Sequence, residues 1–289
     1  MKKVISIVLM VCVCISLTGC DIKANSMEDI NIYTTNYPTE YITQRLYGDH
    51  ATVSSIYPNG VNINEYKLTK KQIDDYSKGD LYIFNGLSET EKGYVTSFRK
   101  KNNNLKIIDT TLYMEYENDI SELWLDPSNF LMMAQNIKKG FKEYINNYYL
   151  NEDINNNYTD LKLETSNLDA KIKQTIKNAS NPVIVTSSSM FKYLEKYGLT
   201  VYSLEENDSL TDKTIQDVKK LIKNKEISYI IVKEDEEVND TIKSLIDNTD
   251  IKTLEWHTLS NITETQKNES QDYFTLMNEN IDILKEELY

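Results

Sequence analysis

The apolar positions of residues 158–179 follow the spacing of a single helical face. They recur at intervals of seven, four and four residues, at Leu161, Leu168, Ile172 and Ile176. Thr159 or Asp160 can cap the first turn, because a short polar side chain accepts hydrogen bonds from the unpaired N–H groups there. Pro182 ends the helix, since a proline disfavours the helical conformation of the residue before it. The pattern predicts a helix in the middle of the chain with one buried face.

Strand and helix patterns alternate on both sides of this helix. In the first half we predict strands at 31–35, 52–56, 80–85 and 105–109, and helices at 38–46, 68–78, 89–101 and 127–149. In the second half we predict strands at 182–186, 200–204, 228–232 and 252–256, and helices at 190–197, 211–224, 237–248 and 270–288. Such alternation implies parallel sheets with right-handed crossovers.

We therefore predict an α/β protein of two lobes, each a mostly parallel four-stranded sheet flanked by helices. The N-terminal lobe would span 29–157, a long rigid connecting helix 158–180, and the C-terminal lobe 181–289. The alternative is one larger α/β domain with an ordinary core helix. Small ligands bind in clefts between lobes and beyond the carboxyl ends of parallel strands. The loops after Ile56, Asp109, Thr186 and Trp256 are thus the expected binding loops.

The N-terminus has the pattern of an export signal. Two lysines precede an apolar run at 4–15 that is too short to span a bilayer comfortably. The following Leu-Thr-Gly-Cys resembles the lipobox of bacterial lipoproteins, which implies removal of a signal peptide, 1–19, and lipidation of Cys20. Residues 20–28 would then act as a tether at the extracytoplasmic face of the cell membrane. The alternative is a plain secretory signal with a chance cysteine.

Charge and cysteine content narrow the possible partners. The full chain carries a net charge of −13. Loss of the signal peptide would leave 30 basic and 45 acidic residues, a charge of −15. Nucleic acid is a poor partner for such an acidic chain, because binding of the phosphate backbone requires a surface rich in lysine and arginine. Cys20 would be the only remaining cysteine, so neither an internal disulfide nor a cysteine zinc site is expected.

Seven segments, in order along nearly the whole mature chain, resemble one family. They are IYTTNYP at 32–38, GD at 48–49, IYPNGV at 56–61, DLYIFNG at 80–86, LWLDPSN at 123–129, VTSSSMFKYL at 185–194 and YFTLMNEN at 273–280. The family is the metal-specific substrate-binding lipoproteins of bacterial ABC transporters, the zinc and manganese group. The resemblance implies two lobes, a rigid connecting helix, and a divalent metal held between the lobes for delivery to a membrane permease.

The metal ligands implied by the resemblance are largely replaced in this chain. The positions of the family's ligands correspond to Asn64, Glu122, Ser188 and, with an uncertain register, His257. Glu122 and His257 are good donors, whereas an amide and a hydroxyl are weak ones, so a metal would be held less tightly than in a complete site. Imidazole admits zinc, nickel, copper or iron, and oxygen donors admit manganese or magnesium. His257 could instead simply pack beside Trp256.

The same residues also allow other functions. Glu65, Glu234 and Asp235 could supply further carboxylates, although a solvated acidic surface also explains them. A family member that has lost metal binding could carry another solute or act as an accessory surface protein. Ser188 and His257 could be imagined as the nucleophile and base of a hydrolase, but no elbow motif accompanies them. We expect a monomeric transport protein and not an enzyme, closing on its ligand by a small tilt.

Overall fold

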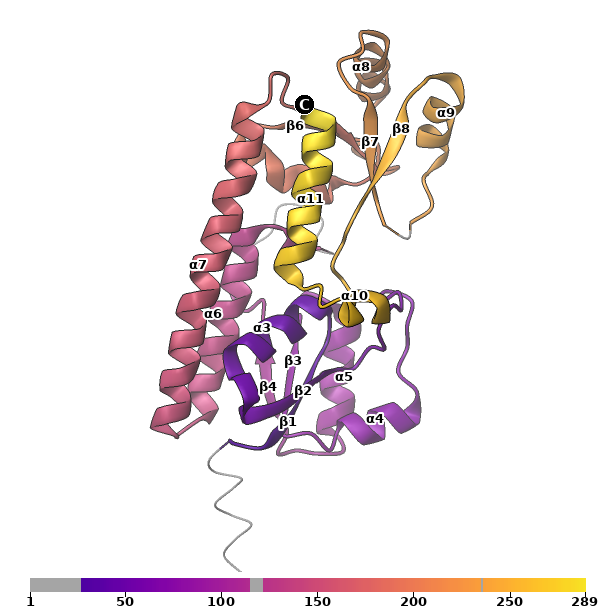
Figure 1. Ribbon diagram of the computed structural model, residues 1–289. Helices are drawn as coiled ribbons and strands as arrows, with labels where there is room; N and C mark the ends of the chain where they lie inside the picture. Colours follow the sequence, from indigo (N-terminus) through magenta and orange to yellow (C-terminus); the bar gives the residue numbers. More distant parts are fainter. Residues whose placement is uncertain (1–26, 115–121, 235) are drawn as a thin grey trace, which may run out of the picture.

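The computed structural model describes residues 27–114, 122–234 and 236–289. Two lobes lie one above the other in Figure 1, and a long helix runs along both. The predicted signal peptide and Cys20 lie outside the described residues, as does Asp235. No helix within the described ranges combines the length and apolar character needed to cross a membrane.

The first lobe is a parallel sheet in the strand order β2-β1-β3-β4. Its strands are β1 (Ile30–Thr34), β2 (Ala51–Ser55), β3 (Leu81–Phe84) and β4 (Lys106–Asp109). Its helices are α3 (Tyr37–Tyr47), η1 (Gly48–His50), α4 (Lys70–Tyr76), α5 (Glu89–Arg99), η2 (Leu123–Leu125) and α6 (Pro127–Tyr144). Every residue of the central strand β3 is buried, as expected for a parallel strand that is covered on both faces.

The second lobe repeats this arrangement with the order β6-β5-β7-β8, again all parallel. Its strands are β5 (Val183–Thr186), β6 (Thr200–Ser203), β7 (Tyr229–Lys233) and β8 (Lys252–Trp256). Its helices are η3 (Ser189–Tyr197), α8 (Asp212–Lys223), α9 (Asp240–Asn248), α10 (Glu264–Asn268) and α11 (Tyr273–Leu288). The predicted fold class, two parallel four-stranded sheets flanked by helices, is confirmed.

The connecting helix α7 (Tyr148–Asn178) is longer than the sequence pattern suggested. It begins at Tyr148 and not at residue 158, because the side chain of Asn147 accepts hydrogen bonds from the backbone N–H groups of Tyr149 and Leu150. Leu150 and Ile154 extend the buried stripe through an asparagine-rich stretch. At 1.5 Å per residue the 31-residue helix is about 46 Å long, enough to pack against helices of both lobes.

Residues 189–197 form a 3₁₀ helix, whereas the apolar pattern suggested an ordinary helix there. The element ends at Tyr197, as predicted, and its C-cap residue Gly198 has a left-handed φ of 95°. Glycine adopts this conformation at no steric cost. The 3₁₀ turn matters for the site, because its N-cap is Ser188.

The largest hydrophobic core extends from one lobe into the other. The rings of Phe130 on α6 and Tyr273 on α11 stack with centroids 3.8 Å apart. Each lobe also has a smaller core of its own on the outer side of its sheet. A shared core ties the lobes together, so we expect a small relative motion and not a wide hinge.

Gly140→Ala is expected to lower the free energy of unfolding by about 1–3 kcal/mol, because it overpacks the contact between α6 and β4. A Cβ at this position would lie 2.6 Å from the side chain of Ile108. Urea denaturation checks this, with Gly93→Ala on α5 as the matched control. No atom lies within 4 Å of a Cβ at Gly93, so alanine there should be neutral or stabilising. Equal stability of both variants would contradict the close packing of α6.

Candidate functional site

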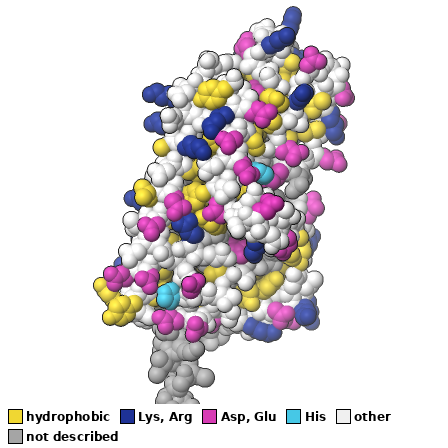
Figure 2. Space-filling model, viewed as in Figure 1, with side chains coloured by type: hydrophobic (Ala, Val, Ile, Leu, Met, Phe, Trp, Pro, Cys, Tyr) yellow, Lys and Arg dark blue, Asp and Glu magenta, His cyan; other side chains and the backbone are white. Residues whose placement is uncertain are grey.

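A cavity of about 590 Å³ lies between the lobes, at the carboxyl ends of strands from both sheets. The first lobe contributes the loop after β2 and the residue that precedes η2, and the second lobe contributes the segments after β7 and β8. Five glutamates and one lysine are among the lining residues: Glu65, Glu122, Glu234, Glu236, Glu237 and Lys233. Acidic side chains are also spread over the face shown in Figure 2. The cavity is therefore strongly anionic, like the chain as a whole.

Cross-lobe hydrogen bonds fix one side of this cavity. The side-chain amide of Asn261 donates to the carbonyl oxygens of Pro58 and Val61, each at 2.8 Å. Gly60 N donates to Ile262 O at 2.9 Å. The first-lobe loop that carries Asn64 is thereby held against the second lobe.

Trp124 forms a further link between the lobes. Its indole Nε1 donates to Thr258 O at 2.8 Å, and its carbonyl oxygen accepts a hydrogen bond from the hydroxyl of Tyr273 at 2.7 Å. The side chain is 1% exposed. Glu122 is the N-cap residue of the same short helix, η2, so the packing of Trp124 fixes the backbone from which Glu122 enters the cavity.

Glu122 faces Lys233 across the boundary between the lobes. The carboxylate side chain is 5% exposed, and its Oε1 lies 3.9 Å from Lys233 Nζ. The same ammonium lies 2.9 Å from Glu236 Oε2. Lys233 is the last residue of β7, and its backbone N–H donates to Ser187 Oγ at 3.3 Å. A cationic side chain thus lies among the carboxylates of the cavity.

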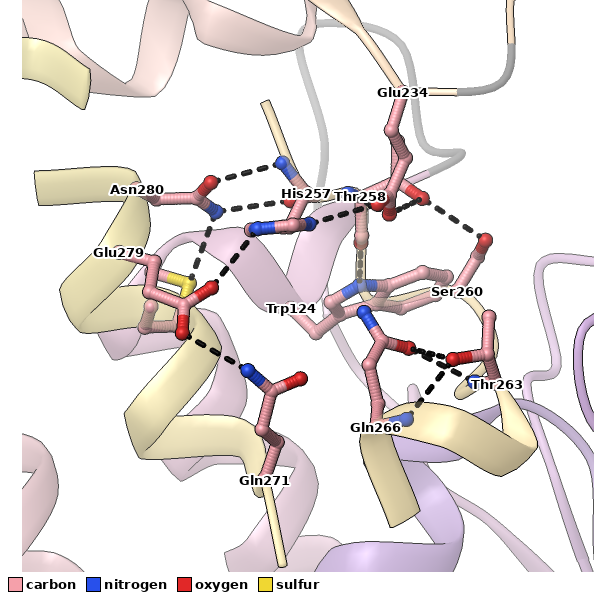
Figure 3. Close-up of polar contacts among 11 residues, drawn as sticks. Trp124, Glu234, His257, Thr258, Ser260, Thr263, Gln266, Gln271, Glu279 and Asn280 are labelled. Atoms are coloured by element: carbon pink, nitrogen blue, oxygen red, sulfur yellow. Dashed lines mark hydrogen bonds and ion pairs between the residues drawn. The ribbon is translucent and has the colours of Figure 1, made fainter. Parts of the chain in front are cut away.

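His257 lies between two carboxylates, as Figure 3 shows. Its Nδ1 is 2.8 Å from Glu234 Oε2, and its Nε2 is 3.1 Å from Glu279 Oε2. The hydrogen bond with Glu234 raises the pKa of His257 against the opposing effect of burial, and Glu279 raises it further. Asn280 fixes the backbone of His257 through two hydrogen bonds, to its N–H and its carbonyl oxygen.

Glu234 links this histidine to the cavity. Burial acts to raise the pKa of Glu234, but hydrogen bonds from His257 and Thr258 outweigh it, so the pKa lies below its ordinary value. Its Oε1 accepts from Thr258 N at 2.7 Å. Glu234 is therefore an ionised carboxylate that lines the cavity and is paired on its other side with His257.

The four ligands proposed from sequence do not all line this cavity. Asn64 and Glu122 do. Ser188 is buried, and its Oγ caps η3 by accepting from Met190 N at 3.2 Å. His257 has both ring nitrogens on carboxylates, and neither it nor Ser188 is among the lining residues. In the described part of the chain, no group of three His, Cys, Asp or Glu side chains stands ready to hold a metal ion.

Sequence reasoning missed Lys233, the last residue of β7, and also Glu236 and Glu237, which follow that strand. The sequence predicts binding loops after four other strands and none after β7. The signal was available: β7 is a nearly continuous apolar run, and its carboxyl end lies at the same edge of the sheet as those of β5 and β8. Glu65 and Glu234, weighed as extra carboxylates, both line the cavity.

A family model for the zinc-uptake complex component A, periplasmic (ZnuA), matches residues 32–287. The chain belongs to the ZnuA family. The resemblance noted in the sequence is confirmed, and the family match covers both lobes and the helix between them.

Relatives of this ZnuA-family chain include named transporter lipoproteins. The metal ABC transporter substrate-binding lipoprotein FimA of Streptococcus parasanguinis is 28% identical over 244 residues, which cover 77% of this chain and 78% of that protein. The manganese ABC transporter substrate-binding lipoprotein PsaA of Streptococcus anginosus is 26% identical over an alignment 313 positions long, which covers 100% of this chain and 99% of that protein.

Solved structures of this family share the fold. The metal-dependent lipoprotein YcdH of Bacillus subtilis has a TM-score of 0.73 at 22% identity, over 90% of this chain and 99% of that chain. The Zn(II)-bound ZnuA-like domain of Streptococcus pneumoniae AdcA has a TM-score of 0.71 at 19% identity, with the same coverage. The two-lobed architecture is therefore that of the family.

Proposed function

We propose that this protein is the lipid-anchored substrate-binding component of an ABC importer, and that its cargo is a divalent transition metal ion, zinc or manganese. Lipidation at Cys20 would hold it, as a monomer, at the extracytoplasmic face of the cell membrane. A permease in that membrane would receive the cargo. Membership of the family and the names of the relatives support this proposal.

The observation that carries the proposal is the anionic cavity between the lobes. Five of its lining residues are glutamates, and the side-chain amide of Asn64 adds a neutral oxygen donor. Carboxylate and amide oxygens suit manganese, and an imidazole would favour zinc. A cavity that both lobes line can couple capture of a cation to their relative position.

We propose Asn64 and Glu122 as ligands, and we add Glu234, which lines the same cavity. Ser188 and His257 remain proposed ligands from the family correspondence. Each would first have to leave its present partners, the N–H of Met190 for Ser188 and the two carboxylates for His257. The function is capture and release, with no chemical step, since the family comprises transport proteins.

Zinc or manganese is expected to raise the thermal unfolding midpoint of the mature protein. A ligand that binds only the folded state adds about 2.7 kcal/mol of stability at 100 times its dissociation constant. Thermal denaturation with each chloride salt, against a chelator-treated sample, measures the shift. Glu122→Gln should abolish it, whereas Glu195→Gln, the same charge change at an exposed position, should leave it intact.

Ser188→Ala and His257→Gln extend this experiment to the remaining proposed ligands. A smaller metal-induced shift in either variant would support that residue as a ligand. The absence of any shift with either metal in the unsubstituted protein would overturn the metal cargo.

A further inference from the structure

Lys233 is the only cationic side chain among the described residues that line the inter-lobe cavity. Its side chain is 19% exposed, much less than a lysine on an open surface. The residue ends a central strand of the second sheet, paired with β8 at Trp256, so its backbone is rigid. From this backbone position the side chain places its ammonium between Glu122 and Glu236.

That place is the boundary between the lobes. Lys233 Nζ lies 3.9 Å from Oε1 of Glu122, which belongs to the first lobe, and 2.9 Å from Oε2 of Glu236, which belongs to the second. The Glu122 side chain is 5% exposed. A buried carboxylate needs a compensating positive charge or strong hydrogen bonds to remain ionised at moderate cost. Lys233 supplies such a charge from within the chain.

We propose that Lys233 sets the affinity of this site for metal ions by acting as an internal cation that a metal ion must displace from Glu122. This inference rests on the proposed function. A divalent ion next to Glu122 would lie within a few ångströms of the ammonium, and two such charges repel strongly in a partly buried site. The lysine side chain must therefore swing away, or the metal binds weakly.

The internal cation also accounts for two features of the site. The cavity is anionic, yet no three carboxylate or imidazole groups of the described residues are arranged to hold a metal. Glu122 and Glu236 lie against Lys233 instead, which is the arrangement expected when an internal cation takes the place of the metal. The Lys233–Glu122 contact also joins the two lobes without any ligand. Metal loading then exchanges one bridge between the lobes for another.

The test compares zinc chloride and manganese chloride binding to the mature protein and its Lys233→Met variant by titration calorimetry. The variant should bind at least one of the two metals about tenfold more tightly or better, because the competing charge is gone. Lys233→Arg keeps a positive charge in the cavity, so it should gain less affinity than Lys233→Met. Lys220→Met is the matched control, since Lys220 forms an exposed i,i+3 pair with Asp217 away from the cavity, and it should bind as the original protein does.

A second measurement uses the metal-free proteins, so that a poorly folded variant does not leave the question open. Lys233→Met alone should lower the thermal midpoint by removing a positive charge beside the buried Glu122, and the double variant Glu122→Gln, Lys233→Met should recover most of that loss. Equal metal affinity in the Lys233→Met variant and the original protein would overturn the internal cation and leave the metal cargo standing. If neither the original protein nor any variant binds zinc or manganese, both the internal cation and the proposed metal cargo are overturned. If the changes in thermal midpoint caused by Glu122→Gln and by Lys233→Met simply add in the metal-free double variant, the two side chains do not interact. That result would overturn the proposal for Lys233 and leave the proposed metal cargo untouched.

Discussion

Trp124→Ala is expected to lower the free energy of unfolding by about 3–5 kcal/mol, the range for truncating a large buried aromatic side chain. The indole is 1% exposed, and its Nε1 donates to the second-lobe carbonyl of Thr258. The backbone of the same residue accepts from Tyr273, whose ring stacks on Phe130. The substitution would therefore open a cavity where the shared core joins the lobes. Urea denaturation measures the loss.

Trp124→Phe separates packing from hydrogen bonding. It keeps an aromatic ring but leaves the carbonyl of Thr258 without the indole N–H, at a cost of about 1–3 kcal/mol. Tyr149→Ala is the control, because that side chain is 76% exposed and its loss should change stability by no more than about 0.5 kcal/mol. A Trp124→Ala variant as stable as the Tyr149→Ala control would refute the assignment of Trp124 to the junction of the lobes.

Glu91→Gln is expected to remove a pH dependence of about 3 kcal/mol from the stability of the protein. Burial raises the pKa of Glu91 from 4.5 to about 7, Asp109 adds to the rise, and a hydrogen bond from Asn85 N opposes it. The folded protein then holds a proton that the unfolded chain has released between about pH 4.5 and pH 7. Stability from this group is fully present below pH 4.5 and is lost as the pH rises through 7.

The measurement is urea denaturation at pH 5 and pH 8 in the presence of a chelator. The original protein should lose more stability between the two pH values than Glu91→Gln, whose neutral amide can still accept from Asn85 N. Burial also raises the pKa of Glu287 to about 7. Its contribution to the pH dependence is the same in the original protein and in Glu91→Gln, so it does not affect the difference between them. Glu89→Gln, at an exposed position on the same helix, should keep the original pH dependence. Parallel pH profiles for the original protein and Glu91→Gln would contradict a buried, proton-binding Glu91.

Local patterns accounted for most of the secondary structure. The run from Leu81 to Phe84 is apolar throughout, which a parallel strand covered on both faces requires. The helix predicted at 68–78 begins after Thr69, which forms a complete capping box with Gln72. These features depend on neighbours within a few residues, which a single sequence contains.

The misses also have local causes. The sequence predicts too late a start for α7, because asparagines have a low helix propensity. In the structure the Asn147 cap and the buried Leu150 outweigh that propensity. The turn at 189–197 has a helical apolar pattern but closes as a 3₁₀ helix. Over only nine residues, the spacing of apolar side chains does not distinguish a 3₁₀ helix, with 3.0 residues per turn, from an α-helix, with 3.6.

The sequence by itself determined the alternation of strands and helices, the parallel sheets, the central helix and the family, because each depends on short-range pattern or on ordered motifs. Only the tertiary structure decided which side chains meet between the lobes. Glu122 and Lys233 are more than a hundred residues apart, and His257 contacts Glu234 and Glu279 from two other elements. Such contacts arise from how the two sheets and α11 pack together. No spacing along the chain encodes that packing, so no reading of the sequence could have paired these charges.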